Sequence, residues 1–463
     1  MNRLPAPPPV GSALDLIGNT PMLELKALDT GPCRLFLKLE NQNPGGSIKD
    51  RIALSMIAAA ERDGSLGPGG VIIEATAGNT GLGLAQVAVP KGYRLILVVP
   101  DKMAREKILH LRALGVEVRL TRSDVGRGHP DYYQDIAARI AAEIPGSVFV
   151  NQFENPANPQ AHEEGTGPEI WEQLSHDVDA VVVGVGSGGT LTGLGHFFRK
   201  VSPKTKMVLA DPEGSILTHY VETGEIVKAG SWAIEGIGED FIPKNAEMDL
   251  VAKAYTISDQ ESIETARLLL SEEGILAGSS TGTLLAAALR WCREQTEPMR
   301  VVTLACDRGD KYLTKVYNDL WVKAQGLTDQ EARGDVSDLI AAKTAEGGVV
   351  TIRPDDTLLT AYNRMRSSDV SQLPVIEDDG RLVGILDESD ILSAVEGKDR
   401  AEQFTHPVRS AMTTAVRTLP PHAPLSDLKP IFDRNEVAVV MDGDDFQGLI
   451  TRVDLINHLR LNG

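Results

Sequence analysis

Short apolar strands alternate with helices along the first 210 residues, and few folds accommodate this order. Strand character is found at residues 22–25, 34–39, 71–75, 94–99, 116–120, 180–185 and 207–210. Helical periodicity is found at residues 48–60, from 81, at 104–114, at 132–144 and from 190. Because the strands are short and almost wholly apolar, the alternation predicts an α/β fold with helices on both faces of mostly parallel sheets.

Two glycine-rich loops, 76–83 and 184–193, each follow a predicted strand and open a helix. Parallel sheets bind ligands at the carboxyl ends of their strands, which is where both loops fall. In the first loop, free amides and two polar side chains suit a carboxylate. In the second loop, consecutive amides and the hydroxyls of Ser187 and Thr190 suit a phosphate monoester.

Two other interpretations of these loops remain open. Each loop is also explained as a tight strand-to-helix turn that needs glycine only for its geometry. The second loop loosely imitates the spacing of a dinucleotide-binding loop, with Asp211 at the end of strand 207–210 as the acidic residue for a ribose.

Lys49 lies where a lysine is chemically useful. It follows Gly45-Gly46 and the expected N-cap residue Ser47, at the start of the predicted helix 48–60. The positive end of a helix disfavours an ammonium group, which makes the amine a better nucleophile toward a carbonyl. The alternative is a solvated surface charge of no chemical consequence.

A third glycine-rich loop, Gly278-Ser279-Ser280, opens a helix at 284–292 and completes a set of groups. Pyridoxal phosphate requires a lysine for a Schiff base, a phosphate cup, a clamp for the substrate carboxylate and a partner for its ring nitrogen. A serine such as Ser280 leaves that nitrogen essentially neutral, whereas an aspartate would keep it protonated. The combination therefore predicts pyridoxal-phosphate chemistry of the β-replacement type.

Residues 11–322 resemble the fold-type II pyridoxal-phosphate β-family, whose members include cysteine synthase and cystathionine β-synthase. The resemblance is carried by the motifs at 45–51, 76–81, 186–190 and 278–280. It implies two αβα subdomains with mostly parallel sheets. It also implies that Lys49 is catalytic and that the cofactor is bound by Lys49, Asn79, Gly186, Ser187, Gly188, Gly189, Thr190 and Ser280. The implied substrate-binding residues are Thr76, Ala77, Gly78, Thr80, Gln152, Gly236 and Glu239. Ala77 replaces the serine that is common in the family, so one hydroxyl contact to the substrate is lost.

The segment Glu235-Gly236-Ile237-Gly238-Glu239 resembles the cystathionine β-synthase version of the substrate loop. That likeness implies condensation of L-serine with L-homocysteine to cystathionine and water, with Lys49 acting as base and then as acid. The alternative is a cysteine synthase, an O-acetylserine or serine sulfhydrylase that makes cysteine or releases hydrogen sulfide. A third hypothesis is a nucleotide sensor whose catalytic half is vestigial. Glu239 is interpreted as a partner for the amino group of homocysteine or as an exposed rim residue. Haem is not expected, because the resemblance begins near Gly11.

The C-terminal part repeats itself at a constant spacing of 64 residues, as in Val375 and Val439 or Asp390 and Asp454. The pair resembles tandem CBS domains, a Bateman module, which often binds adenosyl ligands. We expect residues 1–322 as the catalytic domain, 323–348 as a linker and 349–463 as the CBS pair. Thr451 and Asp454 form the candidate nucleotide turn, whereas Asp387 replaces the hydroxyl in the first copy. A ligand-free dimerisation module is the alternative.

The composition excludes several classes of protein. A net charge of −19 argues against a nucleic-acid or anionic-membrane surface. No apolar run approaches the length of a membrane span, and the three cysteines show neither a disulfide framework nor metal spacing. We expect a cytoplasmic enzyme that binds small molecules, holds no metal and, as is usual in the family, forms a homodimer or higher oligomer.

Overall fold

The computed structural model describes residues 8–462 except 77, 102, 104, 126–127, 328–332, 345–348 and 397–399. The chain divides into two compact units, Met1–Val316 and Tyr317–Gly463, which are called the N-terminal and C-terminal units below. None of the helices among the described residues combines the length and the apolar character needed to cross a lipid bilayer.

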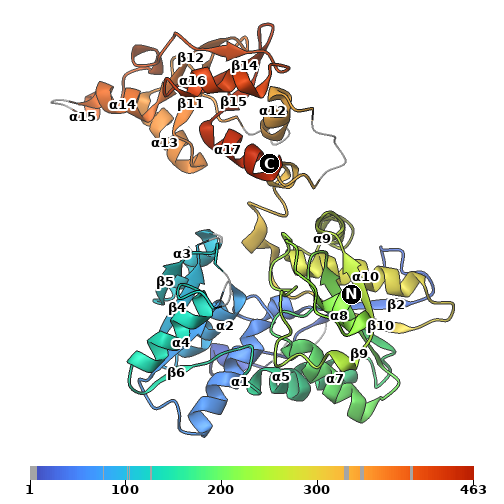
Figure 1. The fold of residues 1–463 in the computed structure, drawn as a ribbon. Coiled ribbons are helices and arrows are strands. Elements are labelled where there is room, and N and C mark those ends of the chain that lie inside the picture. The colour runs from blue at the N-terminus through green and yellow to red at the C-terminus, as the bar shows by residue number, and fades with distance from the viewer. Residues whose placement is uncertain are drawn as a thin grey trace. The chain divides into compact units, whose positions relative to one another are not determined.

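The N-terminal unit contains two sheets, and among the described strands only the pair β1–β2 is antiparallel. The larger sheet has the order β1 (Met22–Leu25), β2 (Arg34–Lys38), β10 (Arg300–Leu304), β7 (Ala180–Val183), β8 (Lys206–Pro212) and β9 (Val251–Ile257). The smaller sheet has the order β5 (Glu117–Thr121), β4 (Arg94–Pro100), β3 (Val71–Ala75) and β6 (Ser147–Phe149). In Figure 1, β4 and β5 belong to one group of elements and β9 and β10 to the other. The predicted α/β class is confirmed.

Helices cover both faces of the smaller sheet, which explains why its strands are continuous apolar runs. The helices of the N-terminal unit are α1 (Lys49–Arg62), α2 (Asn79–Ala88), α3 (Arg105–Ala113), α4 (Tyr133–Glu143), α5 (Ala157–Ala161), the π-helix η3 (His162–Thr166), α6 (Gly167–Gln173), α7 (Gly189–Val201), α8 (Leu217–Thr223), α9 (Asp259–Glu273) and α10 (Ser279–Arg293), with the shorter turns η1 (Ala13–Leu16), η2 (Glu40–Gln42), η4 (Met248–Leu250) and η5 (Gly309–Tyr312). Ile72 of β3 packs with Ile52 and Leu84 of α1 and α2, whereas its neighbour Ile73 packs with Ile140 of α4. Successive side chains of each strand therefore enter opposite cores.

Two helices begin earlier than the periodicity predicts. Helix α2 starts at Asn79 rather than at Gly81, and α10 starts at Ser279 rather than at Leu284, so Gly78 and Gly278 are their N-caps. The apolar pattern marks only where each helix meets the core, and the first turn lies outside that contact. The polar residues of both loops are therefore in first helical turns, where backbone N–H groups have no partner within the helix.

The C-terminal unit contains two copies of one small fold. Its elements are α11 (Asp319–Ala324), α12 (Val336–Thr344), α13 (Leu358–Ser368), β11 (Gln372–Ile376), β12 (Leu382–Asp387), α14 (Glu388–Val395), α15 (Arg400–Gln403), η6 (Val408–Ser410), β13 (Thr418–Leu419), η7 (Leu425–Leu428), α16 (Lys429–Phe432), β14 (Ala438–Asp442), β15 (Asp445–Ile450) and α17 (Arg452–Asn462). The antiparallel pair β11–β12 recurs as β14–β15, and the buried Leu386 of the first pair corresponds to the buried Ile450 of the second.

The segment 323–348, expected as a linker, contains α12. Val336, Leu339 and Ile340 of this helix are buried in the core of the second copy, against Leu428 and Ile450. Although the segment is polar overall, its few apolar residues are spaced for one helix face.

Candidate active site

Lys49 is the first residue of α1 and is half-buried. Gly46 has a φ of +76°, a conformation that favours glycine, and a Cβ there would lie 3.0 Å from the Arg308 side chain. Ser47, expected as the N-cap, is not the cap: that residue is Ile48, and Ser47 Oγ accepts a bond from the Lys49 amide at 3.3 Å. Burial lowers the pKa of the Lys49 ammonium, and Cys306 and Asp307 oppose this only in part.

Four helices direct their N-termini at one pocket. Its lining includes Lys49 at the start of α1, Asn79 at the start of α2, the 188–190 segment at the start of α7 and Ser280 in the first turn of α10. All of the predicted cofactor-binding residues line it: Lys49, Asn79, Gly186, Ser187, Gly188, Gly189, Thr190 and Ser280. Helix N-termini carry partial positive charge, so the pocket favours anionic groups.

The predicted phosphate loop is closely packed, which accounts for its glycines. A Cβ on Gly186 would lie 2.5 Å from the Gly236 carbonyl, and one on Gly189 would lie 1.9 Å from Asn158 Oδ1. Gly188, the N-cap of α7, has a φ of +87°. Asn158 Nδ2 donates to Ser187 Oγ at 2.9 Å, so the serine hydroxyl is an acceptor there and keeps its own proton for an anion in the pocket.

The predicted substrate residues are distributed unevenly. Among the described residues, Gly236 lines the pocket, whereas Thr76, Gly78, Thr80, Gln152 and Glu239 are outside its lining. Ala77 lies outside the described residues. Thr80 Oγ1 donates to Gln152 Oε1 at 2.6 Å, and the Gly78 amide donates to Thr76 Oγ1 at 3.1 Å. The first bond ties the first turn of α2 to the segment after β6, and the second closes the loop before α2 on itself.

Glu239 is held by its backbone. Its amide donates to Ser215 Oγ at 3.1 Å, and its carbonyl accepts a bond from the Ile216 amide, also at 3.1 Å. Burial raises the pKa of the Glu239 carboxyl well above its usual range, Asp240 adds to the shift, and Lys49 opposes it.

Two charged residues outside the predicted site contact Asn79. Asp307 Oδ2 accepts a bond from Asn79 Nδ2 at 2.7 Å, and Lys311 Nζ donates to Asn79 Oδ1 at 2.9 Å. Both follow β10 at its carboxyl end, and this position in a parallel sheet was a signal that could have identified them. The thiol of Cys306, in the same segment, lines the pocket, and burial raises its pKa to about 12.

A cluster of charged side chains beside the pocket connects helix α3, on the side of the smaller sheet, to the pocket wall. Lys107 of α3 is buried and contacts Glu235, a pocket residue. Glu235 Oε1 also accepts a bond from Lys315 Nζ at 2.6 Å, and Lys107 Nζ lies 4.8 Å from the centroid of the Tyr312 ring. The cluster links the smaller-sheet side of the unit to the pocket wall.

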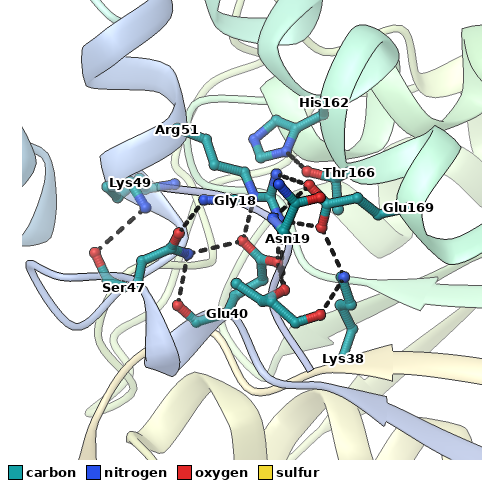
Figure 2. Close-up of polar contacts among 12 residues, drawn as sticks. Gly18, Asn19, Lys38, Glu40, Ser47, Lys49, Arg51, His162, Thr166 and Glu169 are labelled. Carbon is teal, nitrogen blue, oxygen red and sulfur yellow. Dashed lines mark hydrogen bonds and ion pairs between the residues drawn. The ribbon is translucent and has the colours of Figure 1, made fainter. Parts of the chain in front are cut away.

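A second buried network lies under the start of α1 (Figure 2). Arg51 Nε is 2.6 Å from Glu40 Oε2, and Arg51 Nη1 is 2.7 Å from Glu169 Oε1. Lys38 Nζ contacts the other oxygen of Glu169 at 2.7 Å. Burial alone would raise the pKa of the Glu169 carboxyl, but Arg51 and Lys38 lower it to about 2. The network anchors the first turn of α1, and with it Lys49, to the larger sheet.

Pyridoxal phosphate fits the groups that this pocket presents. The amine of Lys49 has a lowered pKa, the 186–190 loop offers amides and hydroxyls at a helix N-terminus, and Ser280 offers a neutral hydroxyl. A side chain on Gly186 or Gly189 would clash with neighbouring atoms, so the loop's backbone amides stay exposed to the pocket. The donors suit an aldehyde that carries a phosphate monoester.

Comparison with known proteins agrees with this geometry. The family model for "Pyridoxal-phosphate dependent enzyme" matches residues 13–307, and the CBS domain model matches 337–397 and 408–461. Cystathionine β-synthase of Saccharomyces cerevisiae is 34% identical over 97% of this chain and 97% of its own. Cysteine synthase 1 of Emericella nidulans is 39% identical over 69% of this chain and 87% of its own. The crystal structure of O-acetylserine-dependent cystathionine β-synthase from Helicobacter pylori matches with a TM-score of 0.61 and 36% identity, covering 66% of this chain and 98% of that one.

Proposed function

The chain belongs to the pyridoxal-phosphate-dependent cystathionine β-synthase family, and we propose that it condenses L-serine with L-homocysteine to L-cystathionine and water. The coarser assignment, β-replacement in transsulfuration or cysteine synthesis, follows from the family itself. The proposal for serine and homocysteine is supported by the yeast enzyme, which matches this chain through both the catalytic and the CBS regions, whereas the cysteine synthase matches 69% of it.

The observation that carries the proposal is the Lys49 amine in a pocket with the 186–190 loop. Pyridoxal phosphate, when bound, supplies the electron sink that makes the α-proton of an amino acid acidic and its β-substituent a leaving group. The lowered pKa of Lys49 keeps its Nζ available as a base for the α-proton. The same Nζ, once protonated, delivers a proton to the departing hydroxyl, which is a poor leaving group as hydroxide. The amides and hydroxyls of the 186–190 loop would hold the phosphate, and the neutral hydroxyl of Ser280 would serve the ring nitrogen without charging it.

The carboxylate of serine is assigned to the loop before α2 and to the segment after β6. The bond between Thr80 and Gln152 holds these two segments together. Because Ala77 offers no hydroxyl, the amides of the loop and the Thr80 side chain would bind the substrate carboxylate.

Glu239 is proposed to recognise the amino group of homocysteine. Burial favours the neutral form of this carboxyl, and an ammonium group beside it would favour the ionised form. Glu239→Gln should raise the KM for homocysteine by about tenfold and leave the KM for sulfide, which has no amino group, within about twofold. Equal changes for both thiols would place Glu239 at the rim.

Product identification tests the reaction. With purified enzyme, serine and homocysteine should give cystathionine by mass spectrometry, at a kcat/KM above that for O-acetylserine and sulfide. The opposite order would favour a sulfhydrylase, an alternative supported by the similarity to cysteine synthase 1 of Emericella nidulans. Borohydride reduction and peptide mapping should place the cofactor on Lys49. Lys49→Ala should abolish turnover, and activity within about tenfold of wild type would refute its assigned role.

The C-terminal unit is proposed to bind an adenosyl ligand through the second CBS copy. Asp454 Oδ2 accepts bonds from the Thr451 amide at 2.6 Å and from the Thr451 hydroxyl at 2.7 Å, which fixes the turn before α17. In the first copy the same turn is made by Asp387 and Asp390, whose carboxylates accept bonds from each other's amides, so the hydroxyl of Thr451 has no counterpart there. Calorimetry with AMP, ATP and S-adenosylmethionine should detect binding that Asp454→Ala weakens. Absence of binding to wild type would leave the unit a structural role.

A further inference from the structure

The side-chain amide of Asn79 lies between two opposite charges. Its Nδ2 is 2.7 Å from Asp307 Oδ2, and its Oδ1 is 2.9 Å from Lys311 Nζ. Both charged residues are buried, Asp307 with 1% and Lys311 with 9% of the residue exposed. They come from the segment after β10, more than 220 positions away from Asn79 in the chain.

The chemistry of these partners fixes which way the amide faces. An ammonium group only donates hydrogen bonds, and a carboxylate only accepts them. If the Asn79 amide were turned over, its amino group would face the Lys311 ammonium and its oxygen would face the Asp307 carboxylate. The carbonyl oxygen is therefore committed to Lys311. One Nδ2 hydrogen goes to Asp307, and the amino group stands on the side of the amide away from Lys311, in a residue that lines the pocket.

The same two residues are themselves held in place. Tyr312 donates its hydroxyl to Asp307 Oδ2 at 2.7 Å. Lys311 Nζ donates to the Gly46 carbonyl at 3.2 Å and approaches the Gly45 carbonyl at 3.4 Å. These glycines belong to the loop that ends at Lys49. One ammonium group thus fixes both the Asn79 amide and the backbone three residues before the reactive lysine.

We propose that Asp307 and Lys311 are positioning residues that orient Asn79 as a hydrogen-bond donor toward the ring hydroxyl of pyridoxal phosphate. The inference rests on the proposed function, in which Asn79 meets that hydroxyl. A donor at this position stabilises the deprotonated form of the ring oxygen, whereas a freely turning amide would present its carbonyl as often as its amino group. Neither residue touches the reacting atoms of the substrate.

The test measures the bound cofactor directly. In the holoenzyme, Lys311→Met and Asp307→Asn should each weaken cofactor binding by about tenfold and shift absorbance from the visible band to the near ultraviolet. Lys311→Arg, which keeps a donor cation, should stay within about threefold of wild type and keep the visible band. In an Asn79→Ala background, Asp307→Asn should cause no further spectral change, because the residue that its carboxylate positions is gone.

Lys91→Met is the control, since Lys91 is a lysine of the same unit that contacts Glu61, and neither residue lines the pocket. It should leave the visible band and the cofactor affinity unaltered. If Lys311→Met and Asp307→Asn keep the wild-type band and affinity, or change them only as much as Lys91→Met does, the positioning role is wrong. A wild-type protein without a visible band, or with the borohydride label on another lysine, would instead overturn the proposed function.

Discussion

Glu74 is a carboxyl group inside the smaller sheet, with 1% of the residue exposed. Its oxygens accept bonds from the amides of Ala75 at 3.0 Å and Gln152 at 3.3 Å, so it ties β3 to the proposed substrate segment. Burial nevertheless raises the pKa of this carboxyl to about 8, from an ordinary 4.5. Between those two pH values the folded chain retains a proton that the unfolded chain has released, and stability therefore falls as the pH rises.

Glu74→Gln should remove this part of the pH dependence. We expect wild type to lose up to about 1.4 kcal/mol per pH unit relative to the variant across that window. Urea midpoints of the holoenzyme, taken in half-unit steps of pH, measure the difference. Glu222→Gln, at an exposed position, is the control and should run parallel to wild type. Parallel curves for Glu74→Gln as well would contradict the assigned burial effect.

The site residues that could be predicted from the sequence each lie in a short, recognisable motif. Lys49, Asn79 and Ser280 each lie in a glycine-rich loop, and all three line the pocket. The position of Asp307 and Lys311 after β10 could have marked them as site candidates, but their role could not be predicted, because it depends on a contact with Asn79 across more than 220 residues. Charge and spacing along the chain carry no trace of such a contact.

Arg51 shows how much stability one buried ion network contributes. Its guanidinium contacts both Glu40 and Glu169, so Arg51→Met would leave two buried carboxylates without their common partner. We expect a loss of about 3–5 kcal/mol in the free energy of unfolding. Arg51→Lys should rescue little of it, because an ammonium group does not reproduce the forked contacts.

Urea denaturation of the holoenzyme measures this loss. Arg290→Met provides the comparison, since Arg290 pairs with Glu261 at a partly exposed position and should cost below about 1 kcal/mol. Equal losses in the two variants would mean that burial adds nothing to the Arg51 network.

At the scale of elements, the order of strands and helices could be predicted from the sequence. The first turns of two helices and the packing partner of a third could not. The alternation of apolar strands and helices predicted the α/β class, because buried parallel strands require it. The early start of α2 and α10 escaped prediction, since Gly78 and Gly278 act as caps outside the apolar pattern. The segment 323–348 was expected as a linker with room for one helix, and what escaped prediction is that this helix, α12, joins a core through three apolar residues.

Helices α1 and α2 approach each other closely at Gly83. A Cβ there would lie 2.8 Å from the Lys49 carbonyl oxygen and 3.2 Å from the Asp50 amide nitrogen, so the backbone of the reactive lysine would have to move. We expect Gly83→Ala to lower kcat/KM by about tenfold or more while the protein remains folded, because catalysis tolerates little displacement of its groups.

Gly195→Ala in α7 is the matched control for that variant. Its added Cβ would lie 2.8 Å from Leu250 Cδ1, the far end of a side chain that can turn away. Both changes replace a helical glycine by alanine, so both gain the same intrinsic helix propensity. Steady-state kinetics and circular dichroism of the pair separate displacement of Lys49 from any general effect of the substitution. Similar kcat/KM values in the two would contradict the close approach.

At the scale of the whole molecule, the two units have separate hydrophobic cores. Among the described residues, the hydrophobic clusters of the N-terminal unit contain no residue after Cys306 in the chain. Those of the C-terminal unit contain no residue before Val336. Every residue that lines the pocket lies in the N-terminal unit. Each unit therefore has what independent folding requires, a core of its own.

A chain that ends at residue 327 should fold, bind pyridoxal phosphate and carry out β-replacement. The reason is that the truncation removes no residue of the pocket and no residue of the clusters that support it. We expect the visible absorbance band to persist and the cofactor dissociation constant to stay within about threefold of the full chain. Thermal unfolding of the full chain should show a transition that the truncated chain lacks, because a second core unfolds separately. A truncated protein that is soluble but colourless, or that binds the cofactor more than about tenfold more weakly, would show that the C-terminal unit contributes to the pocket after all.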